Sequence, residues 1–377
     1  MIRALHTWKF SVYLLVTAYT QIINQPQIPA KMTPPTLRTC LNSCILLLLL
    51  LKLQPATAQV DTSRVEEVIN SKKGALGGKI ALAVWKNGKM IYTKEVGEEF
   101  KVKTRVPVTY ASKWFATATI MTLVDQGKLS LDDRVAEYIP VFAKYAKGYI
   151  TIRHCLFNTT GLEADADKVQ KFFQRKKFEN LEEEVNFYAA KKEIQSNPGT
   201  DFHYGNIGIN IAARVAEIVS KKGFDRLAQE KIFRPLQMRN TTYTTDDNTI
   251  SPATGATSSA ADYVKFLGMI LSKGTFNGKK ILSEEAISQM HTALNANLPI
   301  KYLPRQTEGL TPGLGVWLQP GSNNQPAAVY NPGIYGSFPY IDFQRNYAAV
   351  ITVPNQKKED NRENYLAIKE VLDGVVR

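Results

Sequence analysis

The chain has 377 residues, of which 44% are hydrophobic and 21% are charged. This is the composition of a globular protein, with enough length for one large domain or two smaller ones. A mean hydropathy of −0.21 excludes a multi-span membrane protein. The three cysteines and four histidines show none of the spacings of a zinc site, so we expect neither a metal nor a cofactor.

Positive side chains outnumber negative ones, 47 Lys and Arg against 34 Asp and Glu, for a net charge of +13. Five of the positive charges and no negative charge precede Gln59, which leaves the rest of the chain with an excess of 8. One short segment, 171–177, mixes basic with aromatic residues. We interpret it as a helix with one packed face, and we expect no nucleic-acid partner.

Residues 1–58 have the features of a targeting segment. After Met32 come a positive charge at Arg38, an apolar run over 45–51 and the small-residue sequence Ala56-Thr57-Ala58. This order is typical of a secretory signal peptide, and the run is too short to span a bilayer. We expect cleavage after Ala58, export to the periplasm or the medium, and no stable membrane insertion afterwards. Met32 is a possible true start.

The remaining residues, 59–377, alternate between helical and strand patterns. Apolar spacing predicts a helix over 62–73, strands over 80–85 and 90–93 on either side of Asn87-Gly88, and a helix over 112–126. A mostly helical stretch over about 128–250 follows. Short strands are predicted over 313–318, 327–330, 337–341 and 347–353. A final helix carries Tyr365, Ile368, Val371, Leu372 and Val375 on one side.

This order predicts an α+β fold, in which an antiparallel sheet is flanked by terminal helices and interrupted by a large, mostly helical insertion. We expect one domain over 59–377. Its α/β part would comprise about 59–111 and 252–377, and its helical part about 112–251. Because the sheet draws strands from both chain ends, neither half should fold alone.

Five sequence blocks in this order carry a resemblance. They are YASKWFATATIMTLVDQGKLSLDDRVAEYIP at 110–140, IRHCLFNTTGL at 152–162, PGTDFHYGN at 198–206, TGATSSAAD at 254–262 and NPG at 331–333 with Tyr335-Gly336. Together they resemble the serine β-lactamase and penicillin-binding-protein superfamily. They look most like its branch of class C β-lactamases, D-aminopeptidases and related esterases.

The resemblance implies a β-lactamase-like fold and acyl-transfer chemistry. In the family a Ser at the start of a helix attacks a carbonyl, a Lys three residues later activates it, and the Tyr of a Y-x-N motif moves the proton. Lys113, Tyr204 and Asn206 stand at the last three of these positions. The strand motif, where Asn331 and Gly333 stand, lines the family's pocket and supplies an N–H to the oxyanion hole.

One position departs from the pattern. Three residues before Lys113 stands Tyr110, where the family has Ser. Ser112 cannot replace it, since two residues further along lies about 200° around the helix, and Thr109 is one residue too early. Asn331 also replaces a Lys or His, which removes a cation that could bind a β-lactam carboxylate. We therefore do not expect penicillin hydrolysis.

Three explanations of Tyr110 remain open. The phenol is itself a nucleophile, as in sialidases, or a general acid, so that ester, amide or glycosidic bonds are candidate substrates. Alternatively the protein is catalytically silent and binds a cell-wall or glycan fragment, or Tyr110 is a sequence error or a recent change. We expect Tyr110, Lys113 and Tyr204 to be catalytic, and Asn206, Asn331 and Gly333 to bind a small-molecule, glycan or cell-wall substrate.

Overall fold

The structure is a computed structural model, and it describes residues 61–163, 178–244, 250–322, 325–333, 336–354 and 361–376. The predicted signal segment 1–58, the basic and aromatic segment 171–177, and Tyr335 of the last sequence block lie outside these residues. In the described ranges no helix has both the length and the apolar character needed to cross a bilayer.

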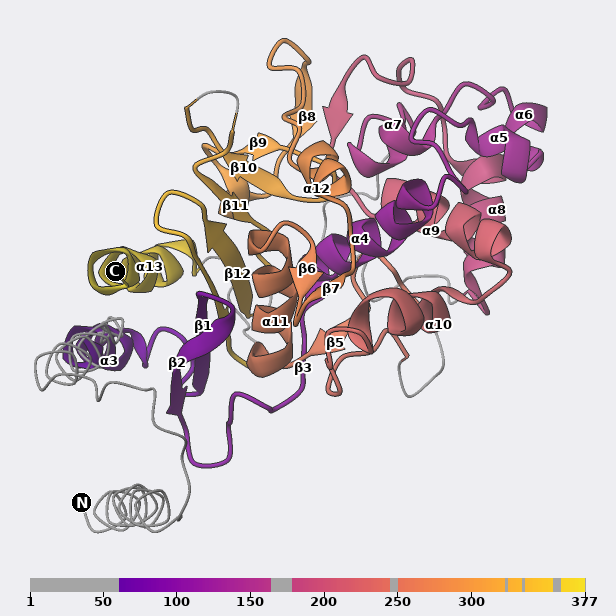
Figure 1. Cartoon of the computed structure of the whole chain (residues 1–377). Helices are drawn as coiled ribbons and strands as arrows, with labels where there is room; N and C mark the ends of the chain where they lie inside the picture. The colour runs from indigo at the N-terminus through magenta and orange to yellow at the C-terminus, as the bar shows by residue number, and fades with distance from the viewer. Residues whose placement is uncertain are drawn as a thin grey trace, which may run out of the picture. The chain divides into compact units, whose positions relative to one another are not determined.

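A seven-stranded antiparallel sheet forms the centre of the domain, with the strand order β2-β1-β13-β12-β11-β10-β9 (Figure 1). Its first two strands come early in the chain and the other five come late, so both ends of the chain build it, as the sequence predicts. The strands are β1 Ile80–Lys86, β2 Lys89–Val96, β9 Thr311–Pro312, β10 Trp317–Gln319, β11 Ala328–Tyr330, β12 Ser337–Asp342 and β13 Tyr347–Thr352.

Both faces of this sheet are covered, which explains why β1 is apolar along almost its whole length. Alternate side chains of a strand point to opposite faces. Ile80, Leu82 and Val84 join the cluster that contains the terminal helices α3 (Thr62–Lys72) and α13 (Arg362–Val375). Trp85 belongs to the other cluster, beneath α11 (Ala260–Leu271). There a Cβ on Gly268 would lie 2.4 Å from the Trp85 ring, so only glycine permits this approach.

The middle of the chain is mostly helical, as expected, and Figure 1 shows it beside the sheet. Its central helix is α4, which is buried over its first three turns and packs against α9 and α12. A helix that is buried all round needs apolar and small side chains on every face, which the sequence of α4 provides. The helices are α4 Ser112–Asp125, α5 Val135–Tyr138, α6 Val141–Lys144, α7 Ile152–Leu156, α8 Leu181–Lys191, α9 Ile207–Ser220, α10 Phe224–Ala228, the π-helix η3 Gln229–Phe233, and α12 Glu284–Met290.

Short elements connect these parts. Two single turns of 3₁₀ helix are η1 Thr109–Ala111, directly before α4, and η4 Arg305–Thr307. Three small two-stranded sheets pair β3 Val106–Pro107 with β5 Thr257–Ser258, β4 Phe202–His203 with β8 Ile300–Tyr302, and β6 Thr275–Phe276 with β7 Lys279–Lys280.

One predicted strand is wrong. The expected strand over 313–318 is a hairpin turn between β9 and β10, and only its last two residues belong to a strand. The N–H of Gly313 donates to the carbonyl of Val316, and Gly315 has a φ of +66°. This left-handed conformation suits glycine and ends the extended chain. The apolar residues of the segment are buried by the turn rather than by a strand.

Candidate functional site

Tyr110 and Lys113 lie where η1 runs directly into α4, so the two side chains project from one continuous helical start. Residues three apart on a helix face the same side. Tyr110 is partly exposed, whereas Lys113 is buried, with 1% of its surface accessible. The residue before Tyr110, Thr109, has a φ of +48°. This conformation is uncommon for a β-branched residue, and such outliers cluster at functional sites.

The ammonium of Lys113 is surrounded by groups that stabilise a positive charge. Its Nζ donates to Oδ1 of Asn206 at 2.6 Å and to the carbonyl of Ala253 at 3.4 Å. It also lies 4.7 Å from the ring centroid of Tyr110 and 4.9 Å from that of Tyr204. The faces of aromatic rings attract cations, as carbonyl oxygens do. The structure therefore places Lys113 among groups that attract a positive charge, between two phenol rings.

Tyr204 completes this cluster. Its ring meets the Tyr110 ring edge-on at 5.4 Å and packs against Trp317 at 5.4 Å. Burial raises the pKa of Tyr204 well above its ordinary value of 10, and the phenols of Tyr110 and Tyr302 raise it further. Tyr204 thus keeps its proton at neutral pH, which suits a proton donor rather than a base.

Asn158 braces the loop that carries Tyr204. Its side-chain oxygen accepts the N–H of Gly205, and its carbonyl accepts the N–H of His203. Asn158 belongs to the second sequence block, just after the end of α7, and it has a φ of +58°. The second sequence block therefore contributes to the site by holding the backbone on either side of Tyr204.

Asn206 occupies the N-cap position of α9 but makes no capping hydrogen bond. An Asn at this position usually accepts a backbone N–H of the first turn. Here its Oδ1 accepts from Lys113 instead. The side chain is thus diverted from stabilising its own helix to holding the ammonium.

A second asparagine on α9, one turn later, supports Lys113 indirectly. Oδ1 of Asn210 accepts the N–H of Ala253 at 3.1 Å, and the carbonyl of Ala253 faces Lys113. The amide of Asn210 donates to the buried carboxylate of Glu184, which also accepts the Tyr188 hydroxyl. The sequence reasoning missed Asn210 and Glu184. The only signal was the i, i+4 spacing of two asparagines on one helix.

The two nearest hydroxyl side chains do not offer a substitute nucleophile. Ser112 is fully buried, and its Oγ accepts the N–H of Ala256 at 3.0 Å. The Oγ1 of Thr109 is also buried, and it has no hydrogen-bond partner in the described part of the chain. Thr109 and Tyr110 are both partly exposed as residues, but the Thr109 hydroxyl is buried, which leaves Tyr110 as the candidate.

The strand motif lies against the start of the helix. A Cβ on Gly333 would lie 2.5 Å from the carbonyl of Val108 and 2.8 Å from Oγ1 of Thr109, so glycine permits the contact. Asn331 is 1% exposed, and its amide donates to the carbonyl of Gly315 at 2.8 Å. The Asn331 amide thus bonds to the turn between β9 and β10. A substrate contact by either residue stays a prediction.

The described residues contain no group of three or more His, Cys, Asp or Glu that could hold a metal ion. His154, which stands in the second block, caps α7: its Nδ1 accepts the N–H of Thr151. The cluster around Lys113 can hold an anion, or a polarised bond of a substrate. Either would lie between the ammonium of Lys113 and the protonated phenol of Tyr204.

A family model described as Beta-lactamase matches residues 69–373. The chain belongs to the beta-lactamase family. Protein flp of Staphylococcus aureus (strain MW2) is 27% identical over 195 residues, which are 49% of this chain and 38% of that protein. The N-acetylmuramyl-L-alanine amidase of Bacillus subtilis (strain 168) is 26% identical over 216 residues, 50% of this chain and 48% of that protein. This beta-lactamase family member spans less than half the length of these curated relatives.

Solved structures agree with the family and the fold. A protein of Bacteroides dorei DSM 17855 that is assigned to the beta-lactamases has a TM-score of 0.73 and 26% identity, covering 84% of this chain and 99% of its own. EstCE1, described as a hydrolase with promiscuous acyltransferase activity, has a TM-score of 0.68 and 19% identity, covering 82% and 98%. At that identity the second likeness concerns the fold alone.

Proposed function

We propose that this chain is a hydrolase or transferase of the beta-lactamase family, in which Tyr110 takes the place of the usual Ser. The observation that carries the proposal is the position of the Lys113 ammonium, 4.7 and 4.9 Å from the rings of Tyr110 and Tyr204. A family member with a disused site would have no physical need for a buried lysine, because burying a charge is costly unless it is paired.

Two roles for Tyr110 follow from its place beside this charge. As a nucleophile, Tyr110 loses its proton to water, and the ammonium stabilises the resulting phenolate. The phenolate oxygen bonds to the substrate carbon while the leaving group departs with a proton from Tyr204. Water then adds its hydroxyl to the bound group and its proton to the Tyr110 oxygen as that bond breaks, and the proton first released to solvent returns to Tyr204. As a general acid, Tyr110 instead protonates the leaving group of a bond attacked by water.

The substrate we propose is an ester, amide or glycosidic bond in a small molecule or cell-wall fragment. The amidase relative from Bacillus subtilis carries a cell-wall substrate in its name. The basic and apolar pattern of residues 1–58 favours export to the periplasm or the medium, where such a substrate occurs. Within the family we place the chain in the branch of class C enzymes, D-aminopeptidases and esterases.

The second candidate function is a catalytically silent protein that binds a cell-wall or glycan fragment. One observation favours it: the Tyr110 ring lies 4.7 Å from the Lys113 ammonium, and a phenol ring there fills space that a serine would leave open for substrate.

The experiment is a hydrolysis panel of chromogenic esters, nitrocefin and aryl glycosides, run with the native protein, Tyr110→Phe and Tyr110→Ser. Native turnover that disappears in Tyr110→Phe supports the tyrosine enzyme, and the active substrate identifies the bond. A silent native protein that gains activity only as Tyr110→Ser supports the binding protein and overturns the enzyme.

A further inference from the structure

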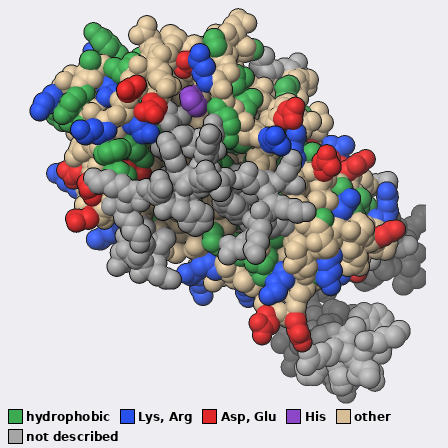
Figure 2. All heavy atoms as spheres, turned by 180° about the vertical axis from the view of Figure 1, so that it is seen from behind, with side chains coloured by type: hydrophobic (Ala, Val, Ile, Leu, Met, Phe, Trp, Pro, Cys, Tyr) green, Lys and Arg blue, Asp and Glu red, His purple; other side chains and the backbone are tan. Residues whose placement is uncertain are grey.

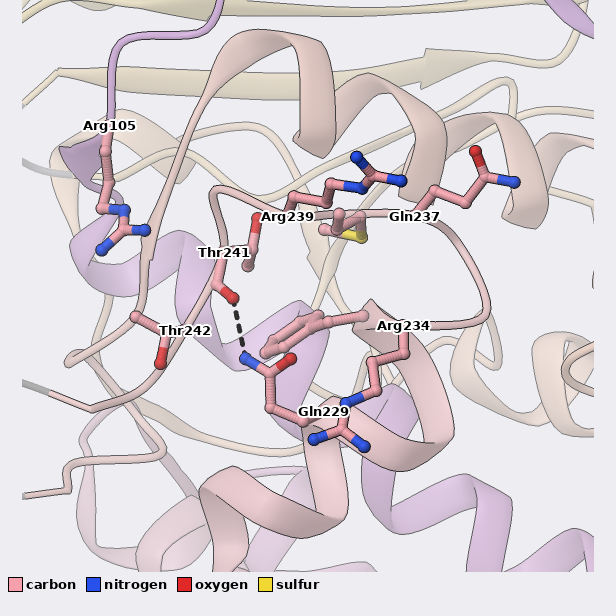
Figure 3. Close-up of a pocket in the computed structure, with 9 residues that line it drawn as sticks. Arg105, Gln229, Arg234, Gln237, Arg239, Thr241 and Thr242 are labelled. Carbon is pink, nitrogen blue, oxygen red and sulfur yellow. Dashed lines mark hydrogen bonds between the residues drawn. The ribbon is translucent and has the colours of Figure 1, made fainter.

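A pocket of about 440 Å³ lies in the helical part of the domain, and it shares no residue with the candidate site. Its lining comes from three segments: the residue before β3, the π-helix η3, and the chain that follows η3. Figure 3 shows Arg105, Arg234 and Arg239 on three sides of a hydrogen-bonded pair, Gln229 and Thr241. Three guanidinium groups, one from the residue before β3 and two from the chain that follows η3, thus surround one hollow.

The fold explains why these segments meet. β3 pairs with β5, where Pro107 stands opposite Thr257, and Thr257 also bridges to Thr242. This short ladder brings Arg105 beside the chain that carries Thr241 and Arg239. On the other side, Nε2 of Gln229 donates to the carbonyl of Thr241 at 2.9 Å and closes the floor of the pocket.

The three arginines are not used in ion pairs within the described ranges: no described carboxylate lies within 4.0 Å of any of them. All three are exposed. Two carboxylates lie behind the floor. Asp225 accepts the hydroxyl of Thr242 and the N–H of Tyr243, and Asp262 accepts the N–H of Asn240 and pairs with Lys265.

The pocket also has an apolar part and an unusual helix. Phe233 and Met238 lie beneath its surface and are buried. Phe233 and Gln229 are the end residues of η3, and π-helical turns are frequent at functional sites. The volume falls within the range of small-molecule pockets and exceeds what a single inorganic ion fills.

We propose that this pocket binds an organic phosphate, with the phosphate among the arginines and the remainder in the rest of the hollow, beside Gln237 and Thr242. The planar guanidinium group donates two parallel hydrogen bonds to phosphate oxygens, which an ammonium cannot match. The phosphate belongs to a soluble ester or to the headgroup of an anionic lipid. Their shared chemistry is what the pocket recognises.

The test is a binding titration of the full chain with inorganic pyrophosphate, and with vesicles of phosphatidylcholine alone or mixed with phosphatidylglycerol. The variants are Arg105→Gln, Arg239→Gln and the two combined. Arg64→Gln is the matched control, because it removes one exposed arginine of α3, outside the pocket. Thermal unfolding checks that each variant is folded.

We expect saturable binding that weakens about tenfold in each single pocket variant, and that does not change in Arg64→Gln. Binding of pyrophosphate alone identifies a soluble phosphate, whereas binding only to the anionic vesicles identifies a lipid headgroup. Absence of saturable binding to either probe overturns the proposal. So does binding that responds equally to Arg64→Gln, because it would depend on net charge alone.

Discussion

The ammonium of Lys113 lies 2.6 Å from Oδ1 of Asn206, across 93 residues of sequence. This contact joins the start of α4 to the start of α9, and it takes the Asn206 side chain away from capping its own helix. Many basic side chains lie on the surface, where Figure 2 shows them interspersed with acidic ones over the visible described face. Lys113 is instead buried beside two phenols, at the centre of the candidate site.

Replacing this ammonium should remove turnover. We expect Lys113→Met to lower kcat/KM roughly 10²–10⁴-fold on the active member of the substrate panel, since the charge beside Tyr110 is lost. Lys147→Met is the control, because Lys147 is also buried and donates to a backbone carbonyl, that of Ala189, at 2.5 Å. Equal losses in the two variants would mean that a damaged fold, rather than a missing charge, explains the effect.

Replacing Asn210 should lower the free energy of unfolding. In Asn210→Ala the buried N–H of Ala253 loses its acceptor and Glu184 loses a donor. The free energy of unfolding should fall by about 2 kcal/mol, measured by urea denaturation. Asn364→Ala, which removes a more exposed amide contact with Asn361, should change it by less than about 0.5 kcal/mol. A similar loss in both variants would contradict the buried role of Asn210.

The pH dependence of activity should reflect the proton on Tyr204. Because burial raises the pKa of Tyr204 well above 10, the phenol stays protonated through the alkaline range. If it donates a proton in the reaction, kcat/KM should show no alkaline decline from Tyr204 up to pH 10. Tyr204→Phe should be less active across the range. A native profile that falls near pH 9, together with a flat profile in Tyr204→Phe, would show that this phenol ionises earlier.

Stability should fall in mild acid because of His291. Part of this residue reaches the surface, but its Nε2 is buried without a partner among the described residues. Burial lowers the pKa of His291 from 6.5 to about 4. The unfolded chain therefore takes up a proton first as the pH falls. Above pH 6.5 His291 is neutral in both states and does not change the free energy of unfolding. As the pH falls from 6.5 to 4, the free energy of unfolding decreases by about 3 kcal/mol.

Urea denaturation at several pH values checks this expectation. His291→Leu should flatten the decline between pH 6.5 and 4, whereas the partly exposed His203→Gln should leave it in place. His154 adds to the same trend, since burial and the charge of Arg153 lower its pKa as well. An unchanged slope in His291→Leu would assign the acid sensitivity to other groups.

Much of the fold was predictable from two kinds of sequence pattern: local apolar spacing, and sequence blocks that follow the order seen in the family. Apolar spacing located α3, β1, β2 and α4 to within a few residues, and the five sequence blocks predicted the fold class. The turn at Gly315 was missed, because a short apolar run with glycines is compatible both with a strand and with a buried hairpin. The hydrogen bond from Gly313 to Val316 and the contact of Asn331 with Gly315 show which of the two forms.

The site was predictable only in part. Spacing alone brought Tyr110 and Lys113 to one face, and the resemblance added Tyr204 and Asn206. The support from Asn210 and Glu184 passes through the backbone of Ala253, more than 40 residues further along the chain than Asn210. A contact made with backbone groups leaves no mark on the side-chain sequence, so the spacing of Asn206 and Asn210 on one helix was its only signal.

The central claim is that the Tyr110 hydroxyl takes part in the reaction. The most direct measurement is kcat/KM of the native protein and of Tyr110→Phe on the active panel substrate, because this change removes one oxygen and keeps the ring beside Lys113. We predict a fall of at least about 100-fold in Tyr110→Phe, with thermal stability preserved. Undiminished turnover in Tyr110→Phe would contradict the account, and so would a native protein that turns over no substrate.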